Sequence, residues 1–206
     1  QFVCQNCGAN SPKWIGKCPA CNEWNTYAEE LIVSKTGRFD HEAIIQSRNV
    51  KPVLVSELKQ ENEKRIDTGN GELNRVLGGG LVHGSVVLIG GEPGIGKSTL
   101  ILQISLKISR LKTLYISGEE SSQQIKLRAD RVHKGETQCY VLSETLLENI
   151  FLHIQELKPD LLVFDSIQTI YTDKIDSSPG TVSQIREYTT RILQYCKTNS
   201  VPAFLI

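Results

Sequence analysis

Apolar residues from about residue 51 onward fall in short runs that alternate with stretches of helical pattern. The short runs contain β-branched or aromatic residues and close at Gly, Ser or Asp, which is typical of buried strands. They span 85–91, 112–118, 138–142, 161–166 and 202–206. The intervening patterns predict helices over 97–109, 121–133, 145–157 and 181–198. This alternation indicates an α/β fold with a mostly parallel sheet that is covered by helices on both faces.

The first part of the chain has a different character. Residues 1–28 are rich in Cys, Asn, Trp, Gly and Pro, and they are too few to bury a core unaided. Residues 29–50 mix charges with scattered apolar residues in no firm period, which indicates a linker. We therefore expect a small module over 1–28, a linker over 29–50 and an α/β core over 51–206.

A glycine-rich loop follows the first predicted strand of the core. Gly91-Glu92-Pro93-Gly94-Ile95-Gly96-Lys97-Ser98 matches G-x-x-x-x-G-K-[ST] at every fixed position. The glycines allow backbone N–H groups to approach phosphate oxygens, and the start of the next helix adds its dipole. The alternative is a simple turn between a strand and a helix. The apolar context on both sides favours a nucleotide site comprising Gly91, Glu92, Pro93, Gly94, Ile95, Gly96, Lys97, Ser98 and Thr99. In this site Lys97 is expected to neutralise the β- and γ-phosphates, and Ser98 to offer a hydroxyl to Mg²⁺.

A carboxylate for Mg²⁺ is expected at the end of a neighbouring strand. Asp165 follows the apolar run Leu161-Leu162-Val163-Phe164, which places it at the edge where open α/β sheets bind ligands. The alternative for Asp165 is a turn or a helix N-cap. Ser166, the next residue, is placed to share in a metal or water network.

ATP hydrolysis also requires a group that orients the attacking water. Glu119 and Glu120 lie just past the second predicted strand, on the same edge as Lys97. Acidic residues also favour the start of a helix such as the one at Ser121, so the pattern leaves both roles open. Glu119 is the preferred candidate and Glu120 the second.

Four of the six cysteines form two close pairs. Cys4-x₂-Cys7 and Cys18-x₂-Cys21 are separated by ten residues, a spacing suited to tetrahedral Zn²⁺. Four protein ligands leave no open position, so the metal is expected to be structural and to supply folding energy. An iron–sulfur cluster and a redox dithiol are the alternatives.

The remaining aromatic, basic and cysteine residues have less specific interpretations. Lys13, Trp14, Lys17 and Trp24 could form a basic–aromatic surface for nucleic acid or protein, but we expect the two indoles to fill the small core. Cys139 and Cys196 are expected to be core residues of the larger domain.

Charge and hydropathy limit the function classes. Lys+Arg and Asp+Glu both count 23, so the net charge is zero, which argues against binding nucleic acid by bulk positive charge alone. No apolar run approaches the roughly 20 residues that span a bilayer, and no signal peptide opens the chain. With cysteines in metal-type pairs, a soluble cytoplasmic protein without a membrane partner is expected. The absence of Met and the apolar end "VPAFLI" suggest a fragment cut inside a domain.

Three stretches of the core carry a specific resemblance. "ELNRVLGGGLVHGSVVLIGGEPGIGKSTLILQ" (72–103), "LYISGEES" and "LLVFDSIQTIY" resemble the landmarks of a RecA-like P-loop ATPase core. "FVCQNCG…PKWIGKCPACNEWNT" and "SPGTVSQIRE" are similar to the RadA (Sms) family of bacterial DNA repair proteins. The resemblance implies Lys97 and Glu119 as catalytic residues, Ser98 and Asp165 as Mg²⁺ ligands, and a four-cysteine zinc ribbon.

The resemblance also implies a function for the whole protein. Members of the family are cytoplasmic ATP-dependent motors of homologous recombination that form hexamers, act on single-stranded and branched DNA, and work alongside RecA. It further implies later core residues and a protease-like domain beyond Ile206. The competing functions are a RecA-like regulatory ATPase that acts on proteins without DNA, a zinc binding module with an inactive core, and a kinase.

Overall fold

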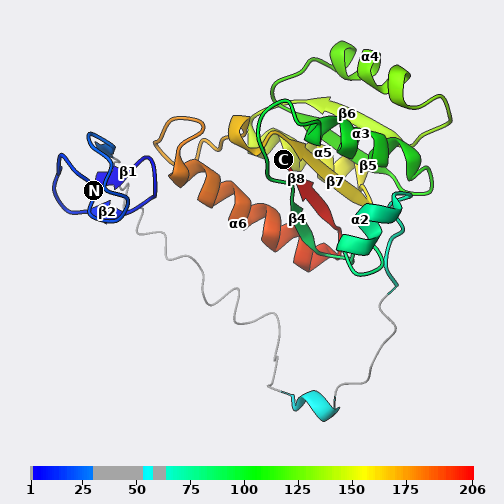
Figure 1. Ribbon diagram of the computed structural model, residues 1–206, viewed down its shortest axis with the longest axis horizontal. Coiled ribbons are helices and arrows are strands. Elements are labelled where there is room, and N and C mark those ends of the chain that lie inside the picture. Colours follow the sequence, from blue (N-terminus) through cyan, green and yellow to red (C-terminus); the bar gives the residue numbers. More distant parts are fainter. Residues whose placement is uncertain (1, 30–52, 58–63) are drawn as a thin grey trace.

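The computed structural model describes residues 2–29, 53–57 and 64–206. They comprise a small N-terminal unit, a 3₁₀ turn at Val55–Glu57 (η1) and a larger α/β unit (Figure 1). Except for Glu29, which ends a strand, the predicted linker 29–50 lies outside the described residues.

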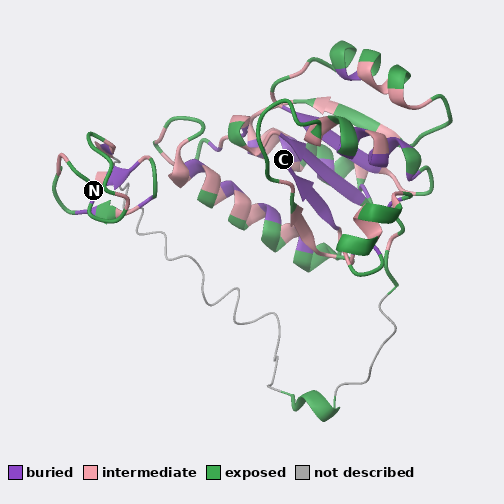
Figure 2. Cartoon of the chain, in the orientation of Figure 1, coloured by how far each residue is buried: buried purple, intermediate pink, exposed green. Residues whose placement is uncertain are grey.

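Five strands of the larger unit form one parallel sheet in the order β4-β8-β7-β5-β6. They are β4 Val86–Leu88, β5 Thr113–Ser117, β6 Cys139–Ser143, β7 Leu161–Asp165 and β8 Ala203–Leu205. The central β5 and β7 are buried along their whole length, whereas the edge strand β6 has exposed positions (Figure 2). This sheet confirms the predicted α/β fold.

Four longer helices cover the two faces of the sheet: α3 Lys97–Lys107, α4 Ser122–Val132, α5 Leu147–Leu157 and α6 Val182–Asn199. Successive side chains of a strand point to opposite faces. Tyr115 therefore packs in the cluster that includes α3 and α4, while its neighbours Leu114 and Ile116 pack in the cluster that includes α5 and α6. Both faces of the sheet are thus buried, which explains the nearly continuous apolar runs of its central strands.

The predicted helices agree with the structure apart from their ends. Two begin one residue later than expected because Ser121 and Thr181 are N-caps. The Ser121 hydroxyl accepts a hydrogen bond from the N–H of Gln124, whose side chain accepts one in return from the Ser121 N–H at 2.8 Å. This reciprocal pair satisfies two of the N–H groups that a helix start leaves unpaired.

Two short elements of the larger unit lie outside the elements that the sequence predicts. Helix α2 covers Gly71–Val76 and is capped by the side chain of Asn70, which accepts a hydrogen bond from Leu73 N. Its six residues, flanked by glycines, are too few to show a helical period. A 3₁₀ turn, η2, covers Ile167–Thr169 directly after β7.

The N-terminal unit, called the ribbon from here on (residues 2–29), is an antiparallel three-stranded sheet in the order β2-β1-β3. Its strands are β1 Phe2–Cys4, β2 Asn10–Ser11 and β3 Tyr27–Glu29. Its core is small, with Cys4, Cys18 and Tyr27 as the buried cluster. So little apolar burial cannot hold such a module together by itself.

Among the described residues, no helix combines the length and the apolar character that crossing a membrane requires.

Candidate functional site

The glycine-rich loop joins β4 to α3 at the carboxyl edge of the sheet. Gly94 and Gly96 have φ of 80° and 100°, a backbone conformation that residues with a Cβ atom rarely adopt. Gly96 is the N-cap of α3, so the helix begins directly at the loop, and Lys97, Ser98 and Thr99 form its first turn. The predicted residues 91–99 are therefore brought together as one loop and one helix start, which is the arrangement that binds phosphate.

The Lys97 ammonium folds back over this loop. Its Nζ donates hydrogen bonds to the carbonyl oxygens of Gly91 and Glu92, at 2.8 and 2.9 Å. Both partners are exposed, so the Lys97 ammonium can exchange them for phosphate oxygens without leaving a buried group unpaired.

Ser98 and Asp165 meet across the site although 67 positions separate them in sequence. The Ser98 hydroxyl donates to Asp165 Oδ1 at 2.8 Å. Adjacent oxygen ligands of an octahedral Mg²⁺ lie about 2.9 Å apart, since each Mg–O bond is about 2.0–2.1 Å. The two oxygens therefore fit one Mg²⁺ ion.

A buried tyrosine and an arginine hold the other oxygen of Asp165. The Tyr115 hydroxyl donates to Asp165 Oδ2, and Arg128 Nη2 lies 3.7 Å from the same oxygen and 3.3 Å from Tyr115 Oη. Burial of the phenol, and then the negative charge of Asp165, raise the pKa of Tyr115 far above its ordinary value. Tyr115 thus remains a proton donor, and Asp165 keeps its carboxylate oriented with Oδ1 toward Ser98.

The two candidate glutamates have different surroundings. Glu120 forms an ion pair with Arg128, with 3.1 Å between Oε1 and Nη1, and is partly buried. Glu119 is exposed, and its Oε1 accepts a hydrogen bond from Ser166 Oγ at 2.7 Å. Of the two glutamates, Glu119 contacts Ser166, the residue after Asp165, whereas Glu120 is held in the ion pair with Arg128.

Glu119 borders a polar hollow of about 300 Å³ at the carboxyl ends of β5 and β6. The hollow is lined by Ser117, Gly118, Glu119, Glu120, Ser121, Ser143, Glu144 and Thr145. The lining offers hydroxyl and carboxylate groups, and water has access to Glu119 because its side chain is exposed.

Gly118 fixes the position of Glu119, and its replacement by alanine should displace the site. A Cβ atom at this position would lie 2.7 Å from Thr169 Cβ and 2.8 Å from Thr145 Cγ2, so the backbone must shift. We expect Gly118→Ala to destabilise the fold by about 1–3 kcal/mol and to lower ATP turnover. Urea unfolding and an ATPase assay measure both effects. Gly71→Ala is the matched control because nothing lies within 4 Å of a Cβ at that position, and an equal response of the two variants would contradict the prediction.

The four paired cysteines converge in the ribbon. Their sulfurs all lie within 4.8 Å of one another. The distance from Cys4 Sγ to Cys21 Sγ is 3.7 Å and that from Cys7 Sγ to Cys18 Sγ is 3.6 Å. Both distances exceed a disulfide bond of about 2.05 Å and agree with the separation of about 3.8 Å that one tetrahedral ion with 2.3 Å metal–sulfur bonds imposes. The residues therefore fit a single metal ion, whereas a multi-iron cluster would hold its thiolates further apart.

Two of these sulfurs each have a hydroxyl group close by. Cys4 Sγ lies 3.2 Å from Thr26 Oγ1, and Cys18 Sγ lies 3.6 Å from Tyr27 Oη. Such outer partners orient metal ligands and stabilise thiolates. The four-cysteine cluster is thus a prepared metal site in the ribbon.

The expectation that both tryptophans fill the ribbon core is wrong. Trp14 and Trp24 are 55% and 68% exposed, and neither belongs to the buried cluster. Cysteines and Tyr27, rather than the indoles, occupy the centre of the ribbon. Of the two other cysteines, Cys196 is fully buried as predicted, and Cys139 is half-buried against the α3 and α4 cluster.

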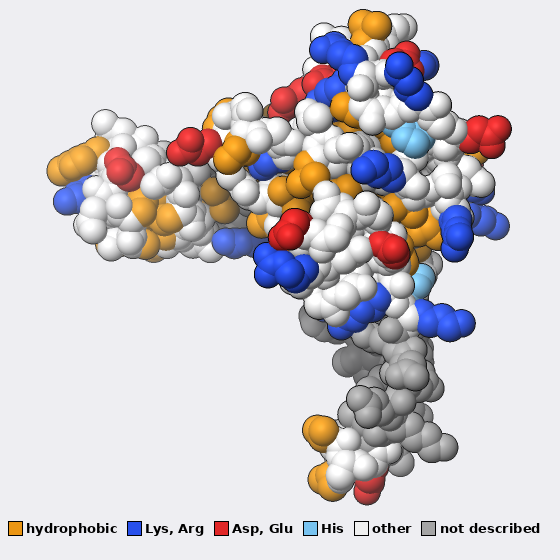
Figure 3. Space-filling view, turned by 45° about the vertical axis from the view of Figure 1, so that its right-hand side comes forward, with side chains coloured by type: hydrophobic (Ala, Val, Ile, Leu, Met, Phe, Trp, Pro, Cys, Tyr) orange, Lys and Arg blue, Asp and Glu red, His pale blue; other side chains and the backbone are white. Residues whose placement is uncertain are grey.

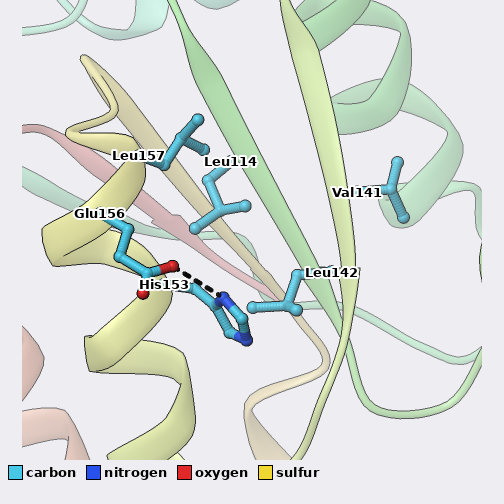
Figure 4. Close-up of a pocket in the computed structure, with 6 residues that line it drawn as sticks. All are labelled: Leu114, Val141, Leu142, His153, Glu156 and Leu157. Atoms are coloured by element: carbon cyan, nitrogen blue, oxygen red, sulfur yellow. Dashed lines mark ion pairs between the residues drawn. The ribbon is translucent and has the colours of Figure 1, made fainter.

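A second hollow, of about 370 Å³, lies between α5 and the edge of the sheet (Figure 4). It is lined by Leu114, Val141, Leu142, His153, Glu156 and Leu157. His153 Nδ1 lies 3.8 Å from Glu156 Oε2, and the other lining side chains are aliphatic. This lining contains none of the predicted phosphate or metal residues, so we assign it no part in the nucleotide site.

Comparison with known proteins agrees with this geometry. A model of the rubredoxin metal binding domain matches residues 2–29, and a model of the AAA domain matches residues 53–186. The chain belongs to the AAA-domain family. The nucleotide loop, Glu119 and Asp165 all lie within the matched AAA domain.

Curated relatives of this AAA-domain protein carry the name DNA repair protein RadA. The protein from Bacillus subtilis (strain 168) is 49% identical over 212 residues, that from Aquifex aeolicus (strain VF5) 48% over 206, and that from Streptococcus pyogenes serotype M1 43% over 206. Each alignment covers 100% of this chain and 45–46% of the relative. The resemblance to RadA is confirmed, and the chain spans a little under half the length of these relatives.

Sequence reasoning missed Tyr115 and Arg128. Tyr115 stands in an apolar run and looks like an ordinary core residue, while Arg128 looks like part of a solvated helix face. A usable signal was a tyrosine in a strand that is buried along its whole length, since a buried phenol needs a hydrogen-bond partner.

Proposed function

We propose that this protein binds ATP with Mg²⁺ and hydrolyses it to drive movement on single-stranded DNA during DNA repair and homologous recombination. The observation that carries the proposal is the Ser98–Asp165 contact at 2.8 Å beside the Lys97 loop. It joins a hydroxyl at the start of the phosphate-loop helix to a carboxylate at the end of a neighbouring strand, and P-loop ATPases hold Mg²⁺ with such a pair.

Each residue of the site has a defined role in this proposal. The backbone N–H groups of Gly94, Ile95 and Gly96 and the Lys97 ammonium bind the phosphates and balance their charge. Ser98 and Asp165 would hold Mg²⁺, which would supply charge neutralisation to the phosphates of the nucleotide. Tyr115 and Arg128 orient Asp165 through its other carboxylate oxygen, Oδ2. Glu119 orients the attacking water and accepts a proton from it.

We propose zinc as the ion of the ribbon, since four cysteine ligands in a closed site suit structural Zn²⁺. Relatives named for DNA repair support a role on DNA. By the same resemblance we propose a cytoplasmic hexamer that acts on single-stranded and branched DNA together with RecA.

The alternative function is a RecA-like regulatory ATPase that acts on protein partners without DNA. The zero net charge of the chain favours this alternative, since bulk electrostatic attraction to DNA is then weak.

Steady-state ATPase rates of the protein with and without single-stranded DNA separate the two functions. Strong stimulation by DNA is expected of the motor. An unchanged rate at all DNA concentrations would contradict the motor and leave the regulatory ATPase.

Replacement of the two neighbouring glutamates should separate their roles. Glu119→Gln should lower the rate of ATP turnover by about 100-fold or more, because general bases contribute about 10²–10⁴-fold, while ATP still binds. Glu120→Gln is the matched variant and should have the smaller effect, since Glu120 is paired with Arg128. ATPase rates and nucleotide affinity measure the two effects. If Glu120→Gln abolished turnover and Glu119→Gln did not, the assignment would be reversed.

A further inference from the structure

The ribbon exposes its two largest apolar side chains. Trp14 is 55% exposed and Trp24 is 68% exposed, although the ribbon has few other residues with which to build a core. In the space-filling view, hydrophobic side chains stand out on the ribbon beside a basic one (Figure 3). Exposure of tryptophan in a module this small is unfavourable for its own folding, so these rings point to a binding role.

The two indoles both lie close to one backbone position, Gly16. A Cβ atom at Gly16 would lie 3.7 Å from Trp14 Cη2 and 3.9 Å from Trp24 Cζ3. Trp24 forms an isolated antiparallel bridge with Lys17, and Asn25 N donates to Gly16 O at 2.7 Å. The backbone that carries the rings is thus held in place, and the rings form one surface, which we call the tryptophan pair (Trp14 and Trp24).

The tryptophan pair is also tied to the metal site. Cys18 is buried next to Lys17, and its N–H donates to Glu23 O at 2.9 Å, one residue before Trp24. The segment that presents Trp24 is therefore anchored on a metal ligand. A bound ion would keep the rings in position before any partner arrives.

Two lysines, Lys13 and Lys17, lie near the tryptophan pair in sequence. Lys17 Nζ lies 5.6 Å from the centre of the Trp24 ring, and Lys13 directly precedes Trp14. Residues 2–29 contain two lysines and two glutamates, Lys13, Lys17, Glu23 and Glu29. Attraction to phosphates alone is accordingly weak, and affinity must come mainly from the ring faces.

We propose that the tryptophan pair is a stacking platform for unpaired bases of single-stranded nucleic acid, with Lys13 and Lys17 contacting the flanking phosphates. Bases stack on aromatic rings regardless of sequence, and base pairing in a duplex hides the faces that this contact needs. A stable protein interface buries about 800 Å² on each partner, which two side chains of a small module do not provide. The inference rests on the DNA-binding part of the proposed function and assigns the ribbon a direct contact with the strand.

The chain contains only two tryptophans, so its tryptophan fluorescence reports on this surface alone. Titration of the zinc-loaded protein with oligothymidylate should quench the fluorescence, and a blunt duplex of equal length should not. Changing both lysines to glutamine should make the dependence of log affinity on log salt shallower by about 1.4, since each contact with a single strand contributes about 0.7.

Variants are tested with a fluorescein-labelled oligothymidylate and anisotropy. Trp14→Ala and Trp24→Ala should each weaken binding by about 5- to 160-fold, the range that corresponds to loss of one stacked base. Trp14→Phe and Trp24→Phe should restore most of the affinity. Tyr140→Ala is the matched control, because Tyr140 is also an exposed aromatic residue, 47% exposed, but lies on β6. Bound zinc and circular dichroism verify that each variant is folded.

Three results would overturn the proposal. The first is binding of the labelled strand without quenching, which would place the DNA elsewhere on the protein. The second is an affinity that neither tryptophan variant changes. The third is the absence of any binding to the strand by either method, which would also remove the DNA part of the proposed function. ATP turnover without DNA, lost in Lys97→Ala, tests the nucleotide site separately.

Discussion

Lys97→Ala should lower ATP turnover by at least about 100-fold while leaving the fold intact. Removing one preorganised group that stabilises developing charge costs about 10²–10³ in rate, and Lys97 is the cation of the phosphate loop. Its ammonium donates hydrogen bonds to the carbonyl oxygens of Gly91 and Glu92, both exposed residues, so its loss leaves neither of them buried and unpaired. Steady-state ATPase assays measure the effect, and thermal unfolding verifies the fold.

Lys107→Ala is the matched control for this experiment. Lys107 lies in the last turn of the same helix, α3, and is exposed. Its replacement removes the same charge at the opposite end, where it interacts favourably with the helix dipole by only about 0.3–1 kcal/mol. Turnover that is unchanged in Lys97→Ala, or lost equally in both variants, would contradict the assigned role.

Removal of the ribbon metal should unfold the ribbon and spare the AAA-domain core. Zinc contributes about 10–16 kcal/mol of apparent binding free energy in small zinc modules, far more than the few buried residues of the ribbon supply. Treatment with a strong chelator should therefore change the fluorescence of Trp14 and Trp24. ATP turnover without DNA should persist.

Single substitutions test the same point without a chelator. Elemental analysis should find one zinc ion per chain in the parent, and little or none in Cys18→Ser. Cys139→Ser should keep its zinc, since Cys139 lies on β6 of the core. A ribbon that keeps its structure after complete loss of metal would refute a structural role for the ion.

Local patterns predicted the core well because its strands and helices differ in period. Within the predicted runs 112–118 and 161–166, the observed strands β5 and β7 are buried along their whole length, as the apolar composition indicated. The loop motif also predicted the meeting of Ser98 with a distant aspartate, since a Mg²⁺ site requires both ligands. Chemistry of this kind specifies a long-range contact that periodicity does not.

The misses come from residues whose roles depend on packing across elements. Arg128 lies in α4 and reaches Glu120 and Tyr115, and nothing in the sequence near it records those partners. The prediction that the two tryptophans are buried failed for another reason. The rule that apolar side chains are buried holds only where a core exists, and in the ribbon the metal site replaces it.

The order of the strands has a consequence for synthesis of the protein. Strand β8 lies between β4, which carries the phosphate loop, and β7, which carries Asp165. During translation the complete loop motif leaves the ribosome about a hundred residues before the strand that joins the two halves of the site, at a rate of about 5–20 residues per second. A nascent chain therefore carries the loop for several seconds without a sheet that can hold Asp165 beside it. The site can therefore form only after β8, the strand between its two halves, has been made.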